Sequence, residues 1–267
     1  MGYVFTHKDA VACEQWACDP CNAVVAELET GLMFDMLRPL PGDAVLDIGC
    51  GVGVNTALMM KKRLDVTGMD PSSPMLDMAA GRVSNRLRLC RGFAEDIPFD
   101  DNAFNHVVFF NTLEFVDDPA AALEEACRVA KDKVFVGVMN PHALKGIQRR
   151  IRGAVSACIY SNARFFSIRE LKAELRRLAG DVPIDARTVD HIPFGRGRLA
   201  RRIAEEDFLK RLPFGAFAGI SATLVPRFRT RPLLLKYAPK KPGVVAGGMP
   251  VKTRDREKTE KFTGICV

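Results

Sequence analysis

The chain has 267 residues, of which 48% are apolar, which is enough for one α/β domain with additions and argues against disorder of the whole chain. Its net charge of +7 is unevenly placed: residues 1–140 carry 12 Lys and Arg against 21 Asp and Glu, and residues 141–267 carry 27 against 11. The basic second part is compatible with an acidic or phosphorylated substrate, a nucleic acid or an anionic membrane surface, and also with solvated helix faces and a basic tail. Its few aromatic side chains argue against specific nucleic-acid binding.

The longest apolar run, residues 215–225, is shorter than the roughly 20 residues that cross a bilayer. The first residues of the sequence also do not show the basic segment followed by an apolar segment that is typical of a leader peptide. Eight cysteines in such a chain favour a reducing compartment over disulfide bonds. We therefore expect a cytoplasmic protein without a transmembrane segment. The sequence does not indicate an oligomeric state.

Apolar periodicity and turn residues predict an alternation of helices and strands. Helices are expected at about 21–38, 54–63, 74–82, 119–130 and 167–179, and strands at about 44–48, 65–69, 87–90, 106–110, 134–138, 184–190 and 217–225. Pro119 favours the start of a helix, with Asp118 as its N-cap. This alternation predicts an α/β fold in which helices connect parallel strands.

A buried strand ending at Ile48 runs directly into three alternate glycines, Gly49, Gly51 and Gly53, and then into a helix. Glycines let the main chain turn sharply and let a ligand approach it closely, and the helix points its first amides at that ligand. Asp70 ends the next strand, where dinucleotide folds place an acid that binds ribose hydroxyls. Together these features predict a site for a nucleotide cofactor.

The segment Leu-Asp-Ile-Gly-Cys-Gly-Val-Gly at 46–53 resembles motif I of class I S-adenosylmethionine-dependent methyltransferases. Segments 68–76, 92–99 and 111–119 continue the likeness in the order of the methyltransferase type 11 branch, and 162–167 is similar to a substrate-side element of small bacterial members. The resemblance implies a Rossmann-like, seven-stranded and mostly parallel sheet with a reversed last strand, flanked by helices and carrying helical lid elements. It also implies an enzyme that uses S-adenosyl-L-methionine to methylate a small-molecule acceptor. The charge of the basic second part makes an anionic acceptor one alternative.

On this basis the chain divides into five parts. These are an N-terminal arm and cap helix (1–40), the cofactor-binding core (41–140), a lid insertion (141–166), a part that completes the sheet and the substrate side (167–238), and a mobile basic tail (239–267). The N-terminal arm and the insertion are together expected to form the lid.

The resemblance implies roles for ten cofactor-binding residues. By motif position, Asp47 orients the methionyl amino group through the glycine loop, and Asp70 accepts hydrogen bonds from both ribose hydroxyls. Relatives usually carry an acid where this chain has Phe93, so either Glu95 replaces that adenine contact or the ring of Phe93 packs on the cofactor. Met69 flanks the adenine or packs in the sheet. The full set is Asp47, Gly49, Cys50, Gly51, Gly53, Met69, Asp70, Ala94, Glu95 and Asn111.

Two residues that follow later strands are candidates for catalysis, because ligands bind outside the carboxyl ends of such strands. Glu114 stands where relatives commonly have a histidine, so it is a candidate general base or a carboxylate for a cationic substrate, and otherwise a solvated residue. His142 follows the fifth strand and is a catalytic candidate or a surface residue.

Three cysteines, Cys13, Cys18 and Cys21, resemble part of an iron–sulfur ligand run, but a fourth ligand at suitable spacing is missing, so we predict no metal. One alternative function is a metalloid or thiol methyltransferase that uses these thiols. Another is a methyltransferase-like protein that binds the cofactor without turnover.

Overall fold

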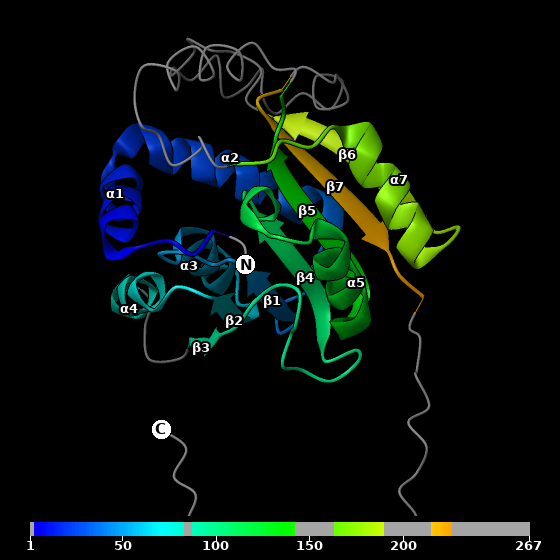
Figure 1. The fold of residues 1–267 in the computed structure, drawn as a ribbon, viewed down its shortest axis with the longest axis horizontal. Helices are drawn as coiled ribbons and strands as arrows, with labels where there is room; N and C mark the ends of the chain where they lie inside the picture. The colour runs from blue at the N-terminus through cyan, green and yellow to red at the C-terminus, as the bar shows by residue number, and fades with distance from the viewer. Residues whose placement is uncertain (1–2, 83–86, 142–162, 190–214, 226–267) are drawn as a thin grey trace, which may run out of the picture. The chain divides into compact units, whose positions relative to one another are not determined.

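Seven strands form one sheet in the order β3-β2-β1-β4-β5-β7-β6 (Figure 1). The strands are β1 (Ala44–Ile48), β2 (Asp65–Asp70), β3 (Arg88–Arg91), β4 (Phe104–Phe110), β5 (Ala130–Met139), β6 (Ile184–Val189) and β7 (Phe217–Thr223). Neighbours from β3 to β5 are parallel, whereas β7 runs antiparallel to both β5 and β6. The predicted sheet, with its reversed last strand, is confirmed.

The computed structural model describes residues 3–82, 87–141, 163–189 and 215–225, except for the side chain of Cys21. Contacts group the chain into two units, residues 1–229 and 230–267, and every described residue belongs to the first. The predicted tail and most of the predicted lid insertion therefore lie outside the described residues.

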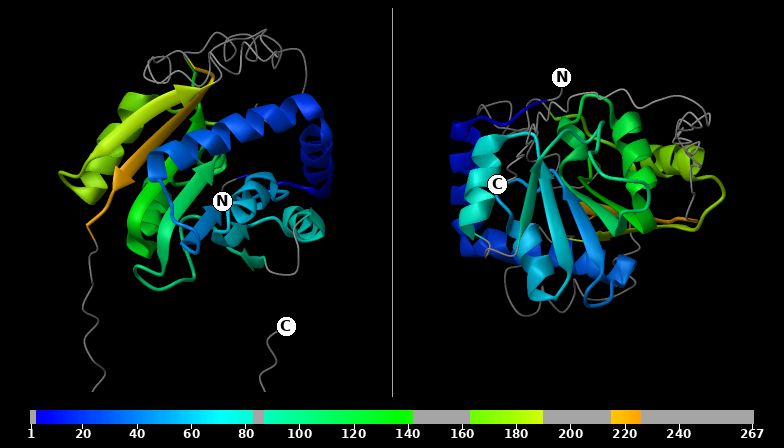
Figure 2. Two further views of the ribbon diagram at one scale, coloured as in Figure 1. Left: turned by 180° about the vertical axis from the view of Figure 1, so that it is seen from behind. Right: turned by 90° about the horizontal axis from the view of Figure 1, so that it is seen from below.

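Helices cover both faces of the sheet. They are α1 (His7–Cys18), α2 (Pro20–Leu37), α3 (Val54–Lys61), α4 (Ser73–Arg82), α5 (Pro119–Val129) and α7 (Ile168–Ala179), with a 3₁₀ turn, η1 (Leu113–Phe115). Helix α2 lies across one face and α5 and α7 lie on the other, as two opposite views show (Figures 1 and 2). Helix α1 contacts helices α2 and α4.

The two faces of the sheet bury different residues because side chains alternate along a strand. Val45 and Val108 pack with Met33 of α2 in one cluster. Their sequence neighbours Leu46 and Val107 pack in the other cluster, which includes the buried faces of α5 and α7. Both faces are therefore apolar, which explains the continuous apolar runs from which the strands were predicted.

The predicted helices and strands are all present, and their ends lie close to those expected except at the start of β5; helix α1 is additional. Strand β5 begins at Ala130 rather than at about residue 134. The first part of the strand is charged, so its sequence did not indicate a buried strand. Lys133 uses that charge to donate from Nζ to the carbonyl of Leu37, at 2.8 Å, at the end of α2. Helix α1 was not predicted, since its apolar pattern is weak and its signal is a capping box between Thr6 and Asp9.

The cap of α5 was predicted from the pair Asp118 and Pro119. The Asp118 carboxylate accepts from the amides of Ala120 and Ala121 at 3.0 and 3.1 Å, and Pro119 is the first helical residue.

Within the described residues, no helix is both long and apolar enough to cross a bilayer.

Candidate functional site

The carboxyl ends of β1, β2 and β4 border a cavity of about 490 Å³, a size typical of small-molecule sites. Strands β1, β2 and β3 follow one another toward one edge of the sheet, and β4 then lies on the other side of β1. Ligands of open α/β sheets bind where the strand order reverses in this way. Seven predicted cofactor residues line the cavity, namely Gly49, Cys50, Gly51, Asp70, Ala94, Glu95 and Asn111.

The loop after β1 turns because its glycines adopt left-handed backbone conformations. Gly49, Gly51 and Gly53 have φ angles of +69°, +52° and +78°, which other residues rarely adopt. A Cβ atom on Gly49 would also collide with the side chain of Thr112. The loop therefore presents bare main chain to the cavity, although Gly53 itself caps α3 and does not line it.

The main chain of Met69 anchors this loop. Its carbonyl accepts from the amides of Gly49 and Cys50 at 2.7 and 3.1 Å. The Met69 side chain is wholly buried in the core and is absent from the cavity lining, so the structure favours the packing interpretation over a contact with adenine. The Sγ of Cys50 lies close to Gly68, and its thiol pKa is raised by burial.

Asp70 is the carboxylate at the end of β2 and lines the cavity. Its Oδ2 accepts from the amide of Gly51 at 3.0 Å, and its Oδ1 accepts from the amide of Ser72 at 2.8 Å. Burial raises the pKa of the Asp70 carboxyl, and these two amides oppose the rise. The same carboxylate therefore fixes the glycine loop and faces the cavity, as a group that binds vicinal hydroxyls must.

Asp47 lies behind the loop and does not line the cavity. It is 1% exposed, and its Oδ2 accepts from the hydroxyl of Thr56 at 2.5 Å in the first turn of α3. Burial raises the pKa of Asp47 to about 7, the Thr56 hydrogen bond opposes this rise, and the charge of Asp70 adds to it. Any effect of Asp47 on a ligand passes through the glycine loop.

The loop after β3 brings Phe93, Ala94 and Glu95 to the cavity wall. The Glu95 Oε1 accepts from the amides of Asp117 and Asp118, at 3.0 and 3.3 Å. Glu95 thus joins two loops of the wall. Phe93 is 37% exposed, which leaves its ring accessible at the edge of the site.

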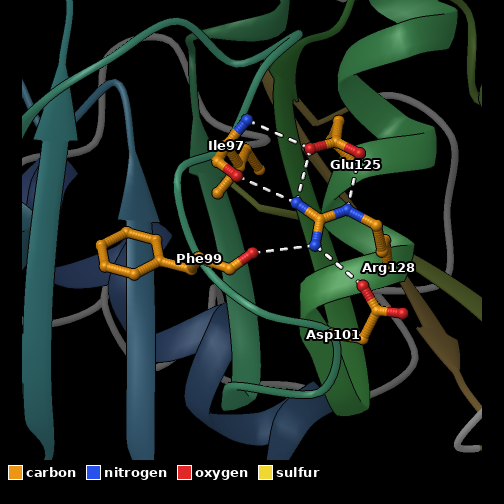
Figure 3. A network of polar contacts seen from close by, with 5 residues as sticks. All are labelled: Ile97, Phe99, Asp101, Glu125 and Arg128. Carbon is orange, nitrogen blue, oxygen red and sulfur yellow. Dashed lines mark hydrogen bonds and ion pairs between the residues drawn. The ribbon is translucent and has the colours of Figure 1, made fainter. Parts of the chain in front are cut away.

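Arg128 of α5 holds the chain that follows this loop (Figure 3). Its guanidinium donates to both carboxylate oxygens of Glu125 at 2.7 Å, to Asp101 at 2.9 Å, and to the carbonyls of Ile97 and Phe99. Glu125 in turn accepts from the amide of Ile97 at 3.1 Å. The network fixes the segment from 97 to 101 against α5 and so positions the wall residues that precede it.

Asn111 follows β4 and was predicted to contact the cofactor. It has a φ of +51°, and its amide nitrogen donates to the carbonyl of Gly137 at 2.9 Å. Its Nδ2 donates to Oε2 of Glu29 at 3.5 Å, whereas its Oδ1 is buried and has no hydrogen-bond partner. Asparagine tolerates this left-handed conformation, which turns the side chain toward the cavity wall.

Glu29 of α2 also lines the cavity and was missed from the sequence. A signal was present: Glu29 lies three, four and seven residues before Leu32, Met33 and Met36, so it shares the buried apolar face of α2. A carboxylate on such an apolar face marks a place where polar groups gather, because a buried charge requires polar partners.

Neither predicted catalytic residue is found in the described lining. Glu114 is 2% exposed in η1, and its Oε1 accepts from the amide of Met139 at 2.8 Å. Its Oε2 is buried without a partner, and burial raises the pKa of Glu114 to about 7. The structure thus favours a role inside the fold and lends no support to contact with an acceptor. His142 lies outside the described residues.

The N-terminal arm covers the cavity. The amide of Tyr3 donates to the carbonyl of Phe115 at 3.0 Å, and the hydroxyl of Ser72 donates to the carbonyl of Phe5 at 2.7 Å. The ring of Phe5 makes edge contacts with Tyr3 and Phe115, with centroids 5.1 and 5.0 Å apart. All three aromatic residues line the cavity and form an apolar part of its wall, and Phe5 also packs against a cluster that includes Val52 of the glycine loop.

The N-terminal cysteines form no metal site in the described part of the chain. Cys13 lines the cavity, and burial, with the charges of Asp9 and Asp70, raises its pKa to about 11. A thiol with such a pKa is protonated near neutral pH and is a poor nucleophile and ligand. Cys18 is exposed, so this geometry gives no support to the metalloid or thiol alternative.

Residues 46–136 match the family model of a methyltransferase domain. An uncharacterized methyltransferase of Mycobacterium bovis is 37% identical over 106 residues, which are 40% of this chain and 43% of the relative. A demethylmenaquinone methyltransferase of Corynebacterium kroppenstedtii is 40% identical over 95 residues, 36% of this chain and 40% of the relative. The chain thus spans less than half the length of these curated relatives.

A solved structure from Thermotoga maritima is similar over more of the chain. It is described as an S-adenosylmethionine-dependent methyltransferase, possibly a histamine N-methyltransferase, and has a TM-score of 0.60 at 24% identity. The alignment covers 81% of this chain and 96% of that one. At this identity the likeness shows the fold alone, and it confirms the predicted fold class. The family match confirms the resemblance stated from the motifs.

Proposed function

We propose that the chain binds S-adenosylmethionine and methylates a small molecule, because residues 46–136 match the family model of a methyltransferase domain. The observation that carries the proposal is the pairing of a bare glycine loop with the Asp70 carboxylate on one cavity wall. The two lie at the ends of adjacent strands, β1 and β2.

The described residues fit the cofactor. A Cβ atom on Gly51 would meet no atom closer than the Gly49 carbonyl oxygen at 4.0 Å, so this glycine leaves open space at the cavity, and Asp70 offers carboxylate oxygens where ribose hydroxyls would bind. The amide of Ala94 is available to adenine, and Asp47 acts through the loop. S-adenosylmethionine supplies an activated methyl group on a sulfonium. The task of the chain is to orient the acceptor and exclude water.

The apolar wall made by the N-terminal arm suits that task. Tyr3, Phe5 and Phe115 line the cavity with apolar rings, and the arm is held in place by a few hydrogen bonds that opening would break. We infer that the arm is part of a lid and that the acceptor has an apolar body. The names of the relatives make quinone and amine acceptors both candidates. A cytoplasmic location remains a prediction.

Calorimetric titration with S-adenosylhomocysteine tests the cofactor assignment without requiring the acceptor. Asp70→Asn removes the charge that strengthens the ribose hydrogen bonds, so affinity should fall at least about tenfold. Asp77→Asn is the control, because Asp77 is exposed on α4 and does not line the cavity. Unchanged affinity in Asp70→Asn, or no binding by the unaltered chain, would overturn the proposal.

A further inference from the structure

The N-terminal arm is fixed on both sides of the glycine loop. The hydroxyl of Ser72 donates to the carbonyl of Phe5 at 2.7 Å, and the amide of Tyr3 donates to the carbonyl of Phe115 at 3.0 Å. Ser72 lies just after β2, and Phe115 lies in η1 after β4. Because β1 stands between β2 and β4 in the sheet, the arm crosses the carboxyl end of β1, where the glycine loop begins.

The arm also packs against the loop that it crosses. Phe5 packs on a small buried cluster that contains Val52 of the glycine loop and Met75 of α4. These three residues line the cavity together with Asp70. The arm therefore covers the part of the cavity that the proposed function assigns to the cofactor.

Ser72 connects the arm to the carboxylate that is expected to bind the ribose. It is 1% exposed, and its amide donates to Oδ1 of Asp70 at 2.8 Å while its hydroxyl donates to Phe5. The other carboxylate oxygen of Asp70 accepts from the amide of Gly51 at 3.0 Å. One series of hydrogen bonds thus runs from the glycine loop through Asp70 and Ser72 to the arm.

The arm is bonded in turn to the helix that follows it. The hydroxyl of Tyr3 and the amide of Thr6 both donate to Oδ2 of Asp9 in α1, at 3.0 and 2.8 Å. Trp16 of the same helix lines the cavity. A movement of the arm away from Ser72 should therefore change the surroundings of Trp16 as well.

We propose that Ser72 is a positioning residue that latches the arm over the bound cofactor, and that the cofactor enters and leaves when this latch opens. The inference deepens the proposed function and rests on it. Methyl transfer converts S-adenosylmethionine into S-adenosylhomocysteine, which must leave before the next cofactor binds. The latch therefore acts on product release as well as on cofactor entry.

Rapid mixing of the full chain with S-adenosylhomocysteine tests this inference. Trp16 is the single tryptophan of the chain, so its fluorescence reports both association and dissociation. Ser72→Gly removes the hydroxyl that holds Phe5. The Ser72 hydroxyl also accepts from the amide of Met75 at 3.4 Å, as the cap of α4, but glycine keeps most of the stability of such a cap.

Both rate constants should rise about fivefold in Ser72→Gly, as the loss of one hydrogen bond allows, because this bond breaks whenever the arm opens. The affinity should stay within about twofold, which also shows that the variant is folded. Ser73→Gly is the matched control, since Ser73 is the next residue of the chain, is exposed and does not line the cavity. It should leave both rate constants unchanged.

Phe5→Ala tests the latch from the side of the arm. It removes the ring contacts with Tyr3 and Phe115, whose centroids lie 5.1 and 5.0 Å from that of Phe5, so it should also raise both rate constants.

Unchanged rate constants in Ser72→Gly and Phe5→Ala would overturn the inference. So would faster dissociation without faster association in Ser72→Gly, since Ser72 would then act only by orienting Asp70. Equal changes in Ser73→Gly would also overturn it. If the unaltered chain does not bind S-adenosylhomocysteine, the proposed function itself fails, whereas binding at rates that ignore Ser72 and Phe5 removes the latch alone.

Discussion

Glu114 should make the stability of the protein depend on pH in the direction opposite to that of an ordinary paired carboxylate. Burial raises its pKa from 4.5 to about 7. Between these values the native state holds a proton that the unfolded state has released, so the free energy of unfolding falls as pH rises. A shift of this size corresponds to about 3 kcal/mol in total, present below pH 4.5 and lost above pH 7.

The substitution Glu114→Gln removes this titration and keeps an oxygen that accepts from the amide of Met139. Urea unfolding of both proteins should be measured from pH 5 to pH 8. The stability of the variant relative to the unaltered chain should rise by about 2 to 3 kcal/mol across that range. Any constant effect of placing an amide at the unsatisfied Oε2 position cancels in this comparison.

Glu124→Gln serves as the matched control, because Glu124 is exposed on α5 and its loss should leave the pH profile unchanged. Parallel profiles of Glu114→Gln and the unaltered chain would refute the reasoning, since they would mean that Glu114 is charged in the native state at neutral pH. A second buried acid with a raised pKa, Asp47, is present in both proteins and contributes the same slope to each.

Two further substitutions test the supports of the cavity wall. Arg128→Lys cannot reproduce the bidentate contact with Glu125, so it should lower the free energy of unfolding by about 2 kcal/mol, which urea unfolding measures. It should also weaken S-adenosylhomocysteine binding, measured by calorimetry, because the chain after Ala94 becomes looser. Unchanged values would show that the loop keeps its position without Arg128. Gly49→Ala should abolish detectable S-adenosylhomocysteine binding in the same titration, because the φ angle at this position is +69° and the new Cβ atom would collide with Thr112. Binding within about threefold of the affinity of the unaltered chain would contradict this expectation.

The strands and the cofactor loop could be predicted because their signals are local. Both faces of β1 and β4 are buried, so each strand is a short apolar run in the sequence. The glycines at 49 and 51 are required by the left-handed φ angles of the loop, which other residues rarely adopt. Asp70 needed only its place at the end of β2.

Side-chain direction was harder to predict than position along the chain. Glu114 was expected at the cavity because it follows β4, but the left-handed turn at Asn111 and the 3₁₀ turn after it direct its carboxyl to the amide of Met139. Met69 likewise stands at the end of a strand, yet alternation sends its side chain into the core while Asp70 faces the cavity. A shift of one residue along a strand changes the face of the sheet to which a side chain points, and motif spacing does not determine that shift.

The two sides of the cavity come from different kinds of structure. The cofactor side consists of short loops after β1, β2 and β3, where main-chain amides and one acid suffice, so a motif describes it. The rest of the wall includes helix faces and an arm that pack over those loops, with Glu29 of α2 and Phe5 of the arm as examples. Such residues are set by tertiary packing and leave only a weak mark on the sequence.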